Sequence, residues 1–136
     1  TITIKNSHLV TLADTITIDQ TTIEANGKLT VQENGYLTIN NGSGIDLDVY
    51  GTLRKEGNGV VARLNSPSSN FNDGGKFELA GTNKYIIVAD WDKNSTCEIT
   101  GEIGGDMTAT YHTDQTFGNF VWNCPAQTAN VYFSGA

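Results

Sequence analysis

The most distinctive group of chemically capable side chains is a tryptophan between two aspartates, Asp90-Trp91-Asp92. The group follows the apolar run 85–89, which predicts a position at the end of a strand. An exposed indole stacks on the apolar face of a pyranose ring, and flanking carboxylates accept hydrogen bonds from its hydroxyl groups. The sequence thus offers a sugar-binding site, whereas the competing interpretation is that Trp91 closes the end of the core. Two more aromatic side chains are candidates for the same site: Tyr85 and Tyr111.

A second candidate site is the pair Asp46 and Asp48, which alternates with the apolar residues of the run 45–49. Alternation predicts that both carboxylates share the solvent face of one strand, about 7 Å apart. The pair could hold Ca²⁺ or face a sugar, although an ordinary hydrated acidic face has the same pattern. With Arg54 it is also the basis for a weaker alternative, a polysaccharide lyase or hydrolase, because glycoside hydrolysis needs two facing carboxylates. We expect no catalytic residues, and no cofactor other than this Ca²⁺.

The two cysteines, Cys97 and Cys124, are 27 positions apart. An even number of cysteines in a secreted chain suggests a disulfide, and one coil of a solenoid would bring this spacing to adjacent rungs about 4.8 Å apart. The alternative is two free thiols that pack as small apolar groups. Two cysteines without a further cysteine or histidine nearby do not complete a tetrahedral metal site.

The two histidines do not indicate an enzyme class. His8 lies between two expected strands, and His112 precedes Asp114 by two residues. No nucleophile motif such as Gly-x-Ser-x-Gly accompanies them, so we expect both to be surface loop residues.

Composition excludes several classes of partner. The 136 residues hold 15 acidic and 8 basic side chains, for a net charge of −7 and a pI near 4.5. Nucleic acid as a partner requires a basic surface that this chain lacks. The longest apolar run is far shorter than the ~18 residues of a membrane helix, so we expect no membrane insertion. Counts of 18 Thr, 14 Asn and 15 Gly favour strands and turns.

Short alternating runs fill the chain and predict an all-β fold. Three of them share the pattern Gly-x-Leu-x followed by a long side chain: 27–31, 35–39 and 51–55. The other alternating runs are 1–4, 9–12, 15–18, 45–49, 60–64, 75–79, 96–100, 120–124 and 130–133. No window has the apolar spacing of an amphipathic helix.

The likeness of successive strands favours a right-handed parallel β-helix, a β-solenoid of about six coils. The alternative is an antiparallel β-sandwich or jelly roll, because Asn-Gly, found at Asn26-Gly27 and Asn34-Gly35, is also a strong hairpin signal.

Two segments carry a resemblance to a known group of proteins. The stretch 25–57, with its Gly-x-Leu-Thr-Val/Ile phrases, resembles the right-handed parallel β-helix repeats of large secreted bacterial surface proteins, including adhesin-like and pectate-lyase-like arrays. The stretch 116–125 resembles a phrase of giant extracellular proteins of the Bacteroidetes. The resemblance implies an extracellular or cell-surface location and a non-catalytic structural or adhesive role.

We expect residues 1–136 to form one solenoid domain that is a fragment of a longer protein. Regular repeats cover 1–64, a long loop covers 65–75, and irregular coils cover 75–136. The ends of a solenoid expose strand edges, so we expect self-stacking or contact with neighbouring domains of the same chain. The alternative function is a carbohydrate-binding module that recognises a polysaccharide or cell-surface glycan through Trp91 and its flanking aspartates.

Overall fold

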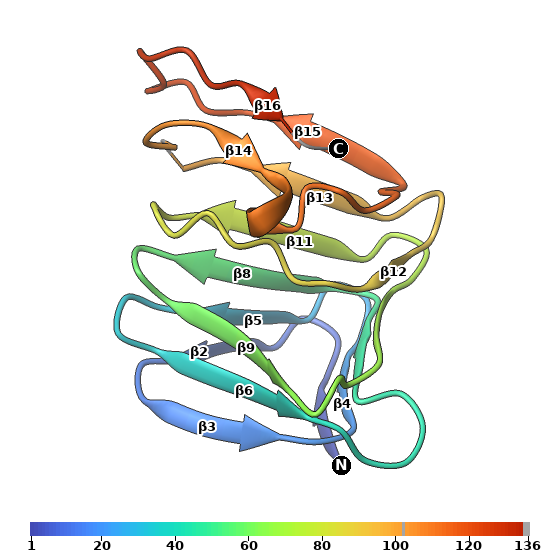
Figure 1. The fold of residues 1–136 in the computed structure, drawn as a ribbon. Coiled ribbons are helices and arrows are strands. Elements are labelled where there is room, and N and C mark those ends of the chain that lie inside the picture. Colours follow the sequence, from blue (N-terminus) through green and yellow to red (C-terminus); the bar gives the residue numbers. More distant parts are fainter. Residues whose placement is uncertain (102, 135–136) are drawn as a thin grey trace.

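The chain folds as a parallel β-solenoid of about five turns (Figure 1). The structure is a computed structural model that describes residues 1–101 and 103–134. Its strands are β1 (Ile2–Ile4), β2 (Leu9–Leu12), β3 (Thr15–Ile18), β4 (Thr21–Ile23), β5 (Lys28–Val31), β6 (Tyr36–Asn40), β7 (Leu47–Val49), β8 (Thr52–Glu56), β9 (Val60–Leu64), β10 (Ser69–Phe71), β11 (Lys76–Ala80), β12 (Asp90–Trp91), β13 (Thr96–Ile99), β14 (Met107–Thr108), β15 (Asn119–Trp122) and β16 (Phe133–Ser134). A single turn of 3-10 helix, η1 (Ala109–Tyr111), follows β14.

Three stacked sheets run along the solenoid. Sheet A has the order β1-β4-β7-β10-β12, sheet B the order β2-β5-β8-β11-β13-β15, and sheet C the order β3-β6-β9. A short pair, β14-β16, lies at the C-terminal end. Every strand pair in the described residues is parallel, which confirms the solenoid and rules against the antiparallel sandwich.

Apolar side chains form continuous rows inside the stack. In sheet B, Leu29 lies opposite Leu53, Leu53 opposite Phe77, and Phe77 opposite Cys97. All four are buried. Because alternate residues of a strand point to opposite faces, the same alternation that buries this row turns the neighbouring residues outward.

The Asn-Gly pairs form corners between strands of one coil, not hairpins. Asn26 and Asn34 adopt left-handed backbone angles with φ of 62° and 68°, a conformation that asparagine tolerates better than most residues. Each corner directs the chain into the next strand of the same coil. At the corner before β8, a Cβ on Gly51 would overlap the carbonyl oxygens of Gly27 and Glu24, so the close stacking of coils requires glycine there.

Several local expectations differ from the structure. No alternating run predicts strands β4, β10, β12 or β14, and β10 lies inside the segment 65–75, for which the sequence predicts a loop. Residues 85–89 were expected to form a strand but pair with no ladder. Their backbone bonds to the segment 111–115 instead, because Ile86 N donates to Tyr111 O and Ala89 N donates to Gln115 Oε1.

This irregular segment marks the end of sheet C. Strand β9 is its edge strand, while sheet B continues through three more strands, β11, β13 and β15. In the part of the chain that the structure describes, no helix is long and apolar enough to span a bilayer.

Candidate functional site

A cavity of about 340 Å³ lies where sheet C ends. Its walls come from β9 and from the irregular segment that follows β11. The lining residues are Lys55, Val60, Val61, Ala62, Arg63, Asn83, Tyr85, Ile86, Ile87, Val88 and His112. The cavity therefore exists because residues 83–88 do not pair with the edge of β9.

Lys55 occupies an inward position that its neighbours fill with aliphatic side chains. In the ladder of sheet B it lies between Val31 of β5 and Leu79 of β11, and its exposed fraction is 1%. Its Nζ donates hydrogen bonds to Tyr85 O at 2.6 Å and to Asn83 Oδ1 at 3.2 Å. No described carboxylate forms an ion pair with it.

Burial of this ammonium group disfavours its charged form and lowers the pKa of Lys55 to about 8. The group would therefore still be mostly protonated near pH 7. A positive charge is thus held inside the solenoid by two neutral oxygen acceptors.

Two further nitrogen-bearing side chains line the cavity. The Arg63 side chain donates one hydrogen bond from Nη2 to Pro67 O at 2.5 Å. His112 Nδ1 lies 2.7 Å from Ile86 O. Because a carbonyl oxygen can only accept, this contact requires the proton on Nδ1. His112 therefore donates to the backbone, and Lys55 and Arg63 are the groups that can offer further hydrogen-bond donors and positive charge to a ligand.

The aromatic candidates fall into two separate places. Tyr85 lines the cavity and contacts Tyr111 edge-to-face, with ring centroids 5.1 Å apart. Trp91 lies instead at a shallow depression of about 230 Å³ on sheet A, with Asp90 and Asp92 beside it. The five residues expected to build one sugar site thus divide between two surfaces.

Trp91 is half-buried and engaged on several sides. Its ring stacks on Phe71 with centroids 4.4 Å apart and planes 9° apart, and Phe117 packs edge-to-face at 5.0 Å. Its Nε1 donates a hydrogen bond to Gln115 Oε1 at 3.1 Å. This packing matches the interpretation in which Trp91 closes the core. Asp90 and Asp92 remain exposed at the rim.

The expectation that Asp46 shares a solvent face with Asp48 is wrong. Asp46 precedes β7 and is fully buried, where its carboxylate accepts hydrogen bonds from Gly42 N, Ser68 N and Ser68 Oγ. Burial opposes ionisation, but these hydrogen bonds together outweigh it and hold the pKa of Asp46 below its ordinary value. Asp46 therefore closes a corner of the coil.

Asp48 and Arg54 do not join Asp46 in a common site. Asp48 is half-buried on β7 and accepts a hydrogen bond from Asn72 Nδ2. Arg54 lies on β8 of sheet B and bonds to Glu56 and Glu78. Within residues 1–101 and 103–134, no group of three or more His, Cys, Asp or Glu side chains is arranged to hold a metal ion.

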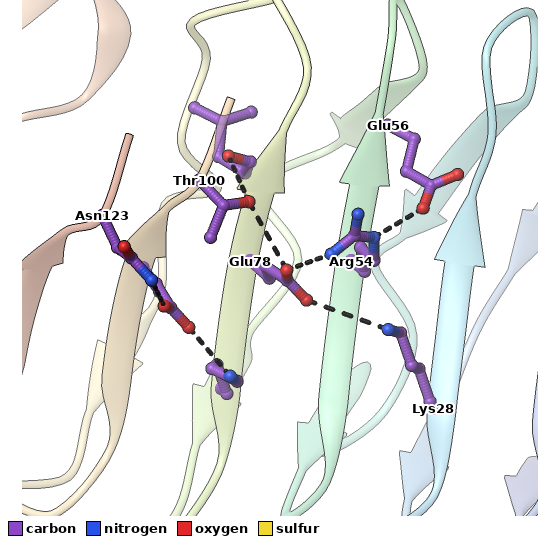
Figure 2. A network of polar contacts seen from close by, with 9 residues as sticks. Lys28, Arg54, Glu56, Glu78, Thr100 and Asn123 are labelled. Carbon is purple, nitrogen blue, oxygen red and sulfur yellow. Dashed lines mark hydrogen bonds and ion pairs between the residues drawn. The ribbon is translucent and has the colours of Figure 1, made fainter. Parts of the chain in front are cut away.

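The outer face of sheet B carries a network of ion pairs (Figure 2). Its side chains are Lys28, Arg54, Glu56, Lys76, Glu78 and Glu98, extended by Thr100 and Asn123. Glu78 is central, because it pairs with Arg54 of β8 and, at 3.8 Å, with Lys28 of β5. Three cations meet three carboxylates, so the network is electrically neutral. Hydrogen bonds from Lys76 and Asn123 lower the pKa of Glu98.

Cys97 and Cys124 are both free thiols in the structure. The register places Cys97 opposite Phe120, whereas Cys124 lies beyond β15 and contacts Ile99 O at 3.2 Å. Cys124 therefore lies four residues further along its coil than Phe120, the residue that faces Cys97, and the two cysteines are not neighbours in the ladder. Burial raises the pKa of both thiols.

Sequence reasoning missed Lys55 as a site residue, although the repeat contains a signal for it. The fifth position of the phrase is Val31 in the first copy and Ile39 in the second, but Lys55 in the third. Lysine is almost never fully buried unless its charge is paired, so a lysine at an inward position of a repeat indicates polar partners inside the coil.

Comparisons of the chain with protein-family models, with curated protein sequences and with solved structures found no match. Its function is therefore inferred from residues and geometry.

Thiol accessibility provides a test of the cysteine arrangement. With Ellman's reagent and no reductant, we expect the folded protein to release one equivalent, from half-buried Cys124, and a second only after unfolding, because Cys97 is fully buried. The Cys124→Ser variant should lose the first phase and keep the second. Absence of any reactive thiol in the unfolded, unreduced protein would demonstrate a disulfide.

The buried charge of Lys55 predicts a pH-dependent stability. Its pKa is about 8 in the folded protein against 10.5 ordinarily, so the unfolded chain binds this proton more tightly. Stability relative to a Lys55→Met variant should rise as the pH increases from about 8 to about 10.5, by up to about 3 kcal/mol in total. Urea unfolding of both proteins across this range measures the difference, and other titrating groups cancel. A difference that does not change with pH would contradict the buried charge.

Proposed function

We propose that the chain is a non-catalytic structural and adhesive module of a secreted bacterial cell-surface protein, of the adhesin type that its repeats resemble in the Bacteroidetes. The observation that carries the proposal is the neutral ion-pair network on the outer face of sheet B (Figure 2). Charged side chains that pair with one another across successive coils stabilise the stack. Because they are already paired, they are not available to bind or activate a substrate.

The distribution of charge along the solenoid supports this role. Glu78 has a side-chain exposure of 12% and bridges three coils through Lys28 and Arg54, and Lys76 binds Glu98 on the next coil at 2.8 Å. Networks of partly buried pairs contribute more to stability than isolated surface pairs do. Such cross-coil links suit a module that transmits load along a surface protein.

Carbohydrate binding is the second candidate, and the depression at Trp91 favours it. Besides Asp90 and Asp92, its rim holds the amide side chains of Asn70 and Asn72 from β10 and the following turn. Amides and carboxylates beside an aromatic edge are the groups that hydrogen-bond sugar hydroxyls. Because Trp91 is half-buried, a bound sugar would contact only the exposed part of its ring, and the polar side chains of the rim would make most of the contacts.

The polysaccharide-cleaving alternative gains no support from the residues on which it was based. The hydrogen bonds of Asp46 occupy its buried carboxylate, and Arg54 is engaged on another sheet. A pair of carboxylates facing each other across a sugar is therefore not built from Asp46 and Asp48.

Force spectroscopy tests the structural role. With the chain held between marker domains, we expect a distinct unfolding force that falls in Glu78→Gln, because the variant leaves Arg54 and Lys28 without their shared carboxylate. Glu24→Gln is the matched control, because it removes the charge of an exposed pair with Lys5, while the amide oxygen can still accept a hydrogen bond such as that from Asn6 N. A wild-type chain that extends without any resolved force peak would argue against a load-bearing module.

Affinity electrophoresis against plant, algal and bacterial polysaccharides tests the second candidate. We expect a binding polysaccharide to retard the wild type and the Asp14→Asn control, but not the double variant Asp90→Asn/Asp92→Asn. These variants spare the stack of Trp91 on Phe71, which Trp91→Ala would disrupt. If every polysaccharide leaves the wild type unretarded, or the double variant is retarded equally, the depression is not a glycan site for that panel.

A further inference from the structure

We propose that the cavity at the edge of β9 is a binding site for a small organic carboxylate, which supplies the counter-charge that Lys55 lacks. The inference goes beyond the structural role proposed above, because it concerns a different face of the molecule and a specific ligand class.

The first step is the unbalanced charge of Lys55. An ammonium group removed from water is strongly disfavoured unless an anion compensates it, and here two neutral oxygens are its hydrogen-bond partners. An ammonium group has three N–H donors, so two acceptors leave one donor for a further contact. A carboxylate in the cavity would provide both the acceptor and the negative charge.

The second step is the composition of the cavity wall. The chain has 15 acidic and 8 basic side chains, yet the lining residues include Lys55 and Arg63 and no aspartate or glutamate. This local reversal of the overall charge favours an anion in the cavity over a cation.

The third step is the shape and polarity of the space. A volume of about 340 Å³ is near the lower end for small-molecule pockets. Apolar side chains from both walls, among them Val61 and Ile86, surround the polar groups. An organic acid can place its carbon skeleton against these side chains, whereas inorganic phosphate has no apolar part to contact them.

The fourth step is that the local backbone is suited to a ligand. Strand β9 is the edge of sheet C, so the backbone groups on its outer side are not committed to a further strand. Across the cavity, residues 86–89 are held from behind by Gln115, whose Nε2 donates to Ile87 O at 3.1 Å, and by His112. A hydrogen bond from Asn83 Nδ2 to Gly59 O also links the irregular segment to the start of β9, so contacts within the protein hold both walls in place without a ligand.

The test is a titration followed by amide chemical shifts in ¹H–¹⁵N spectra, with sodium benzoate and sodium acetate as probes. Benzyl alcohol is the uncharged control for benzoate, and sodium phosphate is the inorganic anion. We expect a carboxylate to shift the amides of residues 60–63 and 85–88 saturably, whereas benzyl alcohol and phosphate do not.

Variants assign the effect to Lys55. Lys55→Met keeps an unbranched side chain, shorter by one atom, and removes its charge, and it should weaken carboxylate binding by about tenfold or more. Lys93→Met, which removes an exposed lysine on another surface, should bind as the wild type does. Binding that is equal in Lys55→Met, phosphate binding as tight as that of either carboxylate, or no saturable shift with either carboxylate would each overturn the proposal. An unchanged fingerprint of distant amides shows that Lys55→Met remains folded.

Discussion

The parallel backbone ladder places every side chain directly on its equivalent in the coils above and below. Inward rows are therefore mostly apolar, as in Leu29, Leu53 and Phe77, because neighbours in a row share one environment, and Lys55 is an exception. The same constraint acts outside, where like charges repel at the strand spacing of about 4.8 Å unless counter-charges offset them, as Arg54 and Lys76 do for the neighbouring Glu78 and Glu98. Arg54 and Glu78, adjacent in the ladder, satisfy it by pairing across the strands (Figure 2).

The constraint also explains why the solenoid can contain an irregular coil. Sheet B runs without interruption through six strands, whereas sheet C stops at β9. The continuous ladder maintains the register, so the segment 83–89 is free to leave the strand conformation and bond to 111–115. Lys55 belongs to this change, because its Nζ satisfies Tyr85 O, which has no strand partner. A break on one side of the coil thus produces a polar interior group and a cavity together.

Much of the fold follows from alternation, and the exceptions have physical causes. The runs 27–31 and 35–39 alternate strictly and form β5 and β6. In contrast, β4 and β10 each bury a polar residue, Thr21 or Ser69, at one of their two inward positions, so they lack the apolar alternation that predicts a strand. Alternation also misplaced Asp46, because the residue precedes β7 and the chain turns there. The site was less predictable still, since the cavity depends on which strands lack a partner, and this is a property of the stack that no single strand reveals.

The two faces of the solenoid differ in how completely their positive charges are paired with carboxylates. This difference distinguishes the structural face from the face with the proposed binding site. On sheet B, three cations meet three carboxylates, so a substitution there changes stability first. At the end of sheet C, a buried cation faces a space without acidic side chains, and a substitution there changes what the space can accept. The ladder of sheet B continues without interruption past this end of sheet C. A solenoid built in this way can keep one structural face constant while the irregular coil on the other side acquires a binding function.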